Sequence, residues 1–117
     1  MDLTEAIKAH SDWKIKLRGA IAARSTLEVG TISKDNCCAL GKWLHGESKG
    51  KFGAYASHQE CTRLHALFHQ QAGKVAAAIN DRRYADAEAM LGSGTPYMSA
   101  SNAVVIAIGA LKREARL

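Results

Sequence analysis

The chain has 117 residues, of which 47% are hydrophobic, and a formal net charge of +5. This length suits one domain over residues 1–117, and the hydrophobic fraction is sufficient for a core. The Lys and Arg residues are scattered and form no basic run with stacking aromatic residues, which argues against a nucleic-acid partner. The most apolar stretch, residues 103–111, is far shorter than the roughly 20 residues of a membrane span.

The cysteine content and the first residues indicate the compartment. Residues 1–10 are polar and amphipathic, and they lack the apolar segment of a secretory signal. Three cysteines cannot all pair, and two of them, Cys37 and Cys38, are neighbours. This pattern favours a reducing compartment over a disulfide framework. We therefore expect a cytoplasmic protein without direct membrane insertion.

The first helix is expected to begin just after Asp2, which is followed by Glu5 in the pattern of a capping box. The helical pattern fades near residues 25–30. His10 falls on the same side of this helix as the apolar residues. That apolar stripe consists of Leu3, Ile7, Leu17 and Ile21.

A short second helix is expected to follow Asp35 as its N-cap and to end near Leu44. Cys38 would then lie in the first turn, where free N–H groups and the helix dipole favour a thiolate. Asp35 is also close enough in sequence to accept a hydrogen bond from a ligand imidazole, although its capping role suffices to explain it. Residues 46–53, rich in Gly, Lys and Ser, predict a loop.

A long third helix is predicted over residues 54–80, with Ser57 and Glu60 as a capping pair. His65 lies on its inward stripe, and His69 lies at the edge of that stripe.

Two further helices complete the chain. A short helix is expected over residues 81–91, and Thr95 and Pro96 fit the N-cap and first position of the last helix. No strand alternation and no internal repeat is present. The sequence therefore predicts an all-α antiparallel helical bundle of about four main helices plus a short helix that carries the cysteine ligand.

Several inward or edge positions carry groups that bind metals. His65 and His69 are spaced i, i+4, so both imidazoles project from one side of a helix. Burying so many titratable groups without a common partner would cost free energy. A tetrahedral zinc ion, which takes three imidazoles and one thiolate, would be such a partner. Cys61 is a rival ligand because it lies i, i+4 to His65, and His58 shares that inner side. The candidate zinc ligands are His10, Cys38, His65 and His69.

Three segments occur in an order that resembles the chemoreceptor zinc-binding (CZB) domain of bacteria. They are His10-Ser11-Asp12-Trp13, Cys38-Ala39-Leu40-Gly41-Lys42-Trp43-Leu44 and His65-Ala66-Leu67-Phe68-His69, and residues 97–105 resemble the last helix of that domain. The resemblance implies a helical-bundle regulatory domain with a 3His/1Cys zinc site. It carries over His10, Cys38, His65 and His69 as the four metal ligands and thereby prefers Cys38 to Cys61.

The resemblance also implies a function. Such domains occur on cytoplasmic chemoreceptors and on diguanylate cyclases, and some act alone or pair as homodimers. Family members are associated with sensing zinc or oxidants such as hypochlorous acid. We therefore expect a sensor domain whose partners are zinc, a second copy, and a chemotaxis or cyclic-di-GMP signalling module in cis or in trans. A zinc-bound thiolate can be oxidised, so Cys38 is the expected redox trigger.

Other classes of function fit less well. A hydrolytic zinc enzyme needs an open coordination position, whereas four protein ligands leave none, and Ala66 stands where a metalloprotease helix has Glu. We therefore expect no enzymatic activity. A purely structural zinc-stabilised bundle that acts as an interaction or dimerisation module is the alternative. Ile15, opposite the inward stripe, and Val105, at an edge of the last helix, are weak indications of a dimer surface.

Trp13 and Trp43 are each consistent with two roles. Each follows a predicted ligand, His10 or Cys38, at a spacing that would allow it to cover the metal. Equally, both are explained as ordinary core or interface aromatic residues.

Overall fold

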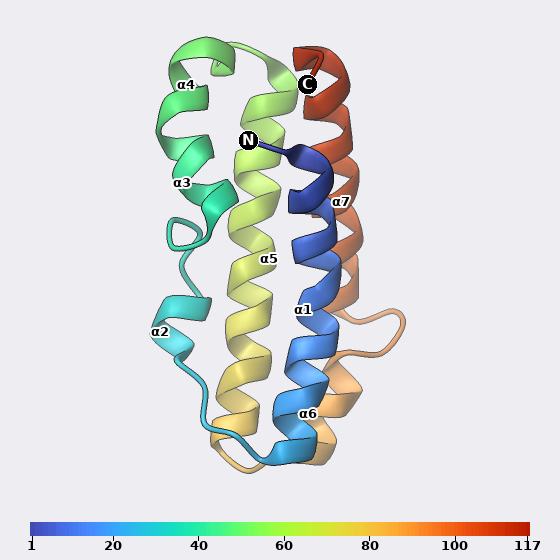
Figure 1. Cartoon of the computed structure of the whole chain (residues 1–117). Coiled ribbons are helices and arrows are strands. Elements are labelled where there is room, and N and C mark those ends of the chain that lie inside the picture. Colours follow the sequence, from blue (N-terminus) through green and yellow to red (C-terminus); the bar gives the residue numbers. More distant parts are fainter.

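The computed structural model describes residues 1–117 and contains helices but no strands. Four antiparallel columns run along the long axis of a molecule that measures 43 × 25 × 19 Å (Figure 1). The all-α bundle predicted from the sequence is therefore confirmed. No helix is both long enough and apolar enough to cross a membrane. The elements are α1 Leu3–Ala23, α2 Val29–Ile32, α3 Ala39–His45, α4 Glu47–Phe52, α5 Ala56–Asn80, α6 Tyr84–Met90 and α7 Pro96–Ala115.

Three columns are built on helices that the sequence predicts. The Asp2 carboxylate accepts the N–H groups of Thr4 and Glu5 and caps α1 as expected. The Thr95 hydroxyl accepts the N–H of Met98 and caps α7, with Pro96 in the first turn. α5 lies at the centre of the bundle and packs extensively on α7, while α6 leads from its end into α7 (Figure 1).

The remaining column is broken into α2, α3 and α4, which ascend along one side of α5 (Figure 1). The sequence pattern did not predict α2. The loop prediction for residues 46–53 is also wrong, because α4 fills Glu47–Phe52. The Ser48 side chain explains this helix: it is fully buried, donates to the Trp43 carbonyl at 2.7 Å and lies 2.9 Å from Nε2 of His58. These contacts compensate for the poor helix propensity of the segment.

The capping pair predicted for α5 is wrong. α5 begins at Ala56 after Tyr55, and no side chain caps it. Ser57 donates instead to Glu114 of α7 at 2.6 Å. Glu60 pairs with Arg63 one turn later. The Ser57 and Glu60 side chains therefore bond to residues farther along the chain and do not form a capping box.

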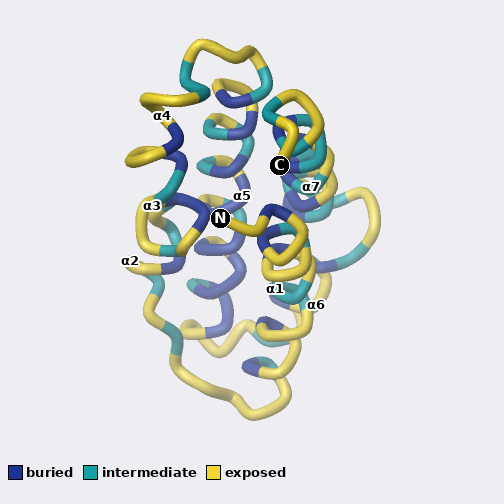
Figure 2. Tube along the Cα trace, turned by 45° about the horizontal axis from the view of Figure 1, so that its top comes forward, coloured by how far each residue is buried: buried dark blue, intermediate teal, exposed yellow.

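The core lies between α5 and its neighbours. Figure 2 shows the buried residues gathered along α5, whereas much of α4 and the outer side of α1 are exposed. Phe68, on α5, is fully buried and packs at a tilt against Tyr97 of α7 with ring centroids 5.7 Å apart. Gly73 allows α2 to approach α5, because a Cβ there would lie 2.0 Å from the Ser33 hydroxyl. The broken column is therefore held against the central helix by close contacts.

Candidate metal centre

Three columns of the bundle bring four candidate ligands to one level. α1 supplies His10, the residue before α3 supplies Cys38, and α5 supplies His65 and His69. One ligand atom from each residue can be chosen so that all four lie within 4.8 Å of one another. The structure therefore brings together every residue of the predicted ligand set.

Cys38 occupies a different helical position from the expected one. It is the N-cap of α3, and its sulfur accepts the N–H of Gly41 at 3.3 Å. Asp35 is not the cap; its carboxylate lies 2.7 Å from Nε2 of exposed His45 and bonds to no imidazole of the cluster. The helix begins three residues later than predicted because the sulfur fills the capping position. α3 is thus capped by the same atom that reaches the histidines.

The distances within the cluster suit a tetrahedral zinc ion. The Cys38 sulfur lies 3.2 Å from Nε2 of His65 and 3.6 Å from Nε2 of His69, and those two nitrogens are 3.1 Å apart. A zinc ion with nitrogen bonds of about 2.0 Å and a sulfur bond of about 2.3 Å keeps its ligand atoms about 3.3–3.6 Å apart. These three donor atoms are therefore already spaced almost as such an ion requires.

Backbone carbonyls set the proton positions on two of the imidazoles. Nδ1 of His10 donates to the Ala6 carbonyl at 2.8 Å, and Nδ1 of His69 donates to the Ile32 carbonyl at 2.9 Å. A neutral imidazole with its proton on Nδ1 has a free electron pair on Nε2. Nε2 of His10 is buried and has no hydrogen-bond partner. Such an orphaned acceptor inside a protein is what a bound metal ion would satisfy.

His65 differs from the other two histidines. It is fully buried, and its Nδ1 has no hydrogen-bond partner. Burial, followed by the neighbouring His69 and His10, lowers the pKa of His65 to about 3. This imidazole is therefore neutral across the physiological range and is available as a ligand without first losing a proton.

Burial acts in the same direction on the other ligands. It lowers the pKa of both His10 and His69, against the opposing effect of their backbone carbonyl partners. Burial also raises the pKa of the Cys38 thiol, and the N–H of Gly41 offsets only part of that rise. The helix N-terminus alone therefore does not produce the thiolate expected from the sequence. A cationic partner is needed, and zinc would supply it.

Gly41 is a structural requirement that the ligand pattern alone does not reveal. A Cβ at this position would lie 1.6 Å from the Asp35 carbonyl oxygen and 3.1 Å from Cε1 of His65. Only glycine leaves room for the Asp35 backbone to pack this closely on the first turn of α3, with the His65 ring beside it. The motif contains this residue, so the signal was present, whereas the carbonyls of Ala6 and Ile32 leave no trace in a sequence.

The rival ligands lie outside the cluster. Cys61 is fully buried, and burial raises the pKa of its thiol to about 12. Cys37 is exposed, and its thiol donates to the Asn36 side chain at 3.6 Å. His58 bonds to Ser48 instead. The tertiary structure therefore selects Cys38 from the three cysteines.

The two tryptophans have different surroundings. The Trp13 ring stands edge-on to His69 with centroids 6.2 Å apart, so it flanks the cluster. Trp43 packs on Phe52, with centroids 6.3 Å apart, where α3 meets α4. Trp13 thus covers one side of the histidines, while Trp43 belongs to the apolar contacts of the broken column.

Comparison with known proteins agrees with this geometry. Residues 10–76 match the chemoreceptor zinc-binding domain family, a span that includes all four clustered residues. The chain belongs to the chemoreceptor zinc-binding domain family. No curated protein and no solved structure matches it. In this CZB domain the donor set of the cluster, three imidazoles and one thiol, suits zinc better than the harder metals, which prefer oxygen ligands.

Proposed function

We propose that this CZB domain is a regulatory sensor that binds one zinc ion through His10, Cys38, His65 and His69 and acts without catalysis. The four donors would fill a tetrahedral shell and leave no position for a reactive water molecule. A hydrolytic zinc enzyme needs that position and a general base beside it. Ala66 follows the first histidine of the α5 pair, where a zinc protease has Glu.

The observation that carries this proposal is the double role of the Cys38 sulfur. The same atom caps α3 and lies within 3.2–3.6 Å of two α5 imidazoles. α3 has only seven residues, so it depends on such tertiary contacts for its stability. Chemistry at this one sulfur would therefore release both the cap and the attachment of α3 to α5.

Oxidation of Cys38 is the proposed trigger. Bound zinc keeps the sulfur as a thiolate, the nucleophilic form. The thiolate attacks hypochlorous acid, an S–O bond forms, the O–Cl bond breaks, and the products are a sulfenic acid and chloride. A sulfenic acid is a poorer ligand and a poorer acceptor for the Gly41 N–H. The release of α3 would then be the conformational output.

Two other triggers or roles use the same residues. In zinc-level sensing, occupancy of the site ties α1, α3 and α5 together, because binding energy becomes folding energy when the metal-free site is loose. In a structural zinc bundle, the metal stabilises the fold, and the domain serves as an interaction or dimerisation module. Both predict one zinc ion per chain, but neither predicts release by a small dose of oxidant.

The proposed context is a cytoplasmic signalling protein. The domain would control chemotaxis or cyclic-di-GMP signalling, in cis or in trans, and would pair with a second copy. The exposed Ile15 of α1 and Ile106 of α7 support such pairing, since both side chains are about 70% exposed. Val105, named from the sequence, is half-buried beside Ile106.

The deciding experiment is native mass spectrometry of the full chain before and after one equivalent of hypochlorous acid. We expect one zinc ion per chain, lost as Cys38 gains one oxygen atom. Retention of zinc with Cys38 reduced would favour the structural role or zinc-level sensing. Absence of zinc from protein prepared without chelators would refute the metal site. For the catalytic alternative, an absorption spectrum of the cobalt-substituted protein that is unchanged by azide would indicate a closed shell.

A further inference from the structure

One cleft reaches the metal cluster from outside. It has a volume of about 400 Å³ and lies between α1 and residues 38–40. His10 and Cys38 form part of its wall, whereas His65 and His69 do not line it and are at most 2% exposed. Cys38 itself is half-buried. The sulfur is therefore the part of the cluster that a small molecule in this cleft can approach.

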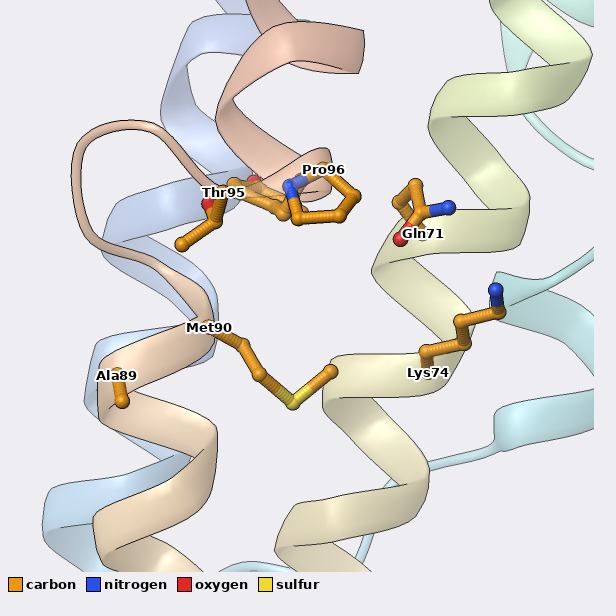
Figure 3. Close-up of a pocket in the computed structure, with 7 residues that line it drawn as sticks. Gln71, Lys74, Ala89, Met90, Thr95 and Pro96 are labelled. Carbon is orange, nitrogen blue, oxygen red and sulfur yellow. The ribbon is translucent and has the colours of Figure 1, made fainter.

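A second recess of similar volume has no connection with the ligands. It lies between α5, α6 and the start of α7 and contains no His or Cys residue. In the close-up of Figure 3, Gln71 and Lys74 project from α5, Met90 reaches across from α6, and Pro96 closes the other side. This recess offers no path to Cys38, whereas the cleft beside α1 has Cys38 in its wall.

The wall of the cleft beside α1 is mainly apolar. Seven of its eleven residues are hydrophobic, among them Ala9 and the Trp13 ring. An apolar wall favours molecules that lose little hydration energy when they enter, which disfavours ions.

The charged groups around this cleft carry both signs. Asp2 and Glu5 contribute two carboxylates, and Lys16 and the terminal amine of Met1 contribute two ammonium groups, so the formal charges cancel. The Lys16 ammonium lies 5.0 Å from the centre of the Trp13 ring, where the π electrons attract it. Glu5 makes no salt bridge, although its charge acts on Lys8 one turn along α1.

We propose that this cleft is the route by which small reactants reach the Cys38 sulfur, and that it favours uncharged electrophiles over anionic ones. The inference rests on the proposed function for its biological meaning and names the class of oxidant: hypochlorous acid rather than the hypochlorite anion. Trp13 and Ala9 shape the route, and the apolar wall supplies the selectivity against ions.

The test compares three thiol reagents on the full chain. Methyl methanethiosulfonate is uncharged, the sulfonatoethyl reagent is anionic and the trimethylammonioethyl reagent is cationic. In each case the thiolate attacks the sulfenyl sulfur, a disulfide forms and methanesulfinate leaves. Peptide mass spectrometry at timed intervals gives separate rates for Cys38 and for exposed Cys37, which serves as an internal reference.

The expected result is a difference in selectivity between neighbouring residues. The ratio of the uncharged to the anionic rate should be at least about tenfold higher at Cys38 than at Cys37, because only Cys38 is reached through an apolar cleft. The cationic reagent should be disfavoured as well, because an apolar wall opposes charges of either sign. Equal ratios at the two cysteines would overturn the proposal.

Two variants test the route itself. Ala9→Trp places an indole at the exposed edge of the cleft and should slow labelling of Cys38 severalfold without affecting Cys37. Ala22→Trp is the matched control, an exposed alanine of α1 outside the cleft. Glu5→Lys should raise the anionic rate at Cys38 severalfold at low salt and leave the uncharged rate unchanged, whereas Glu28→Lys should change neither. Unchanged Cys38 rates in both test variants would refute the route.

The same samples separate this inference from the proposed function. Zinc content is measured alongside labelling. If oxidant fails to release zinc while the labelling ratios differ as expected, the sensor proposal fails and the route stands. If oxidant releases zinc but the ratios are equal at Cys37 and Cys38, the route fails and the sensor proposal stands.

Discussion

Nε2 of His65 lies 3.2 Å from the Cys38 sulfur, although the two residues are 27 positions apart in the chain. One belongs to the central helix, and the other caps the first turn of a seven-residue helix. The contact fixes where the broken column sits along α5. It also makes the position of α3 depend on the chemistry of one sulfur atom.

The three cysteines should differ sharply when each is replaced by serine. Cys38→Ser should weaken zinc binding by at least about 100-fold. Replacing a group that only hydrogen-bonds to a metal ligand already lowers metal affinity by about 10–100-fold, and this substitution removes a ligand itself. It should also abolish release of zinc by hypochlorous acid. Cys37→Ser and Cys61→Ser should retain one zinc ion per chain. Competition with a chromogenic chelator measures these affinities, and loss of binding in Cys37→Ser but not in Cys38→Ser would show that the ligand is the other cysteine.

Gly41→Ala should damage both stability and zinc binding. The added methyl group would overlap the Asp35 carbonyl and press on the His65 ring, so α3 must shift away from α5. Overpacking of this kind typically costs about 1–3 kcal/mol in the free energy of unfolding. Urea denaturation of the zinc-loaded protein measures it.

Gly19→Ala is the matched control for that substitution. Gly19 lies within α1, and an added Cβ would meet nothing within 4 Å. The change should stabilise the protein by up to about 1 kcal/mol, because alanine is the better helix former. Equal effects of the two substitutions would contradict the close packing described at Gly41.

Removal of zinc should loosen the broken column before the rest of the bundle. Cys38 holds α3, and the Ile32 carbonyl at the end of α2 bonds to His69. Hydrogen exchange of the amides of residues 32–46 should therefore accelerate after chelation, whereas the contact between α5 and α7 should keep its protection. At a free zinc concentration of 100 times Kd, binding should stabilise the folded protein against unfolding by about 2.7 kcal/mol. Uniform acceleration across all helices would instead indicate that the whole fold depends on zinc.

His58 should make the stability of the protein depend on pH. Burial, with a smaller effect from His45, lowers the pKa of His58 below its ordinary value. The unfolded chain therefore binds a proton more readily, so the stabilisation is complete above about pH 6.5 and is lost as the pH falls towards the folded value. His58→Gln keeps a partner for Ser48 without titrating. Its urea midpoint should fall less than that of the unmodified chain between about pH 7.5 and 5.5 at equal total zinc. Equal losses would show that His58 does not contribute.

The local signals in the sequence were sufficient for the long helices. Asp2 and Thr95 bond to N–H groups two or three residues away, and such caps act within one turn of the chain. The i, i+4 spacing likewise put His65 and His69 on one side of α5 before any fold was known. The prediction of an all-α bundle needed no more than this periodicity.

Only the tertiary structure decided how the broken column is built. α3 starts directly after Cys38, whose sulfur meets the histidines, and α4 forms where buried Ser48 bonds to Trp43 and His58. These partners lie on other elements or across a turn, so no local pattern specifies them. A capping or helix preference is worth about 1 kcal/mol, and several buried contacts together outweigh it.

The same division applies to the metal cluster. From the residue types and their spacing, Cys61 was as good a partner for His65 as Cys38, and the resemblance to known CZB domains favoured Cys38. The fold separates the two physically, because the side chain of Cys61 is buried elsewhere in the core while Cys38 lies beside both α5 imidazoles. Spacing along one helix determines which side chains share a face. The meeting of groups from different columns depends on how those columns pack, which the sequence encodes only through the whole core.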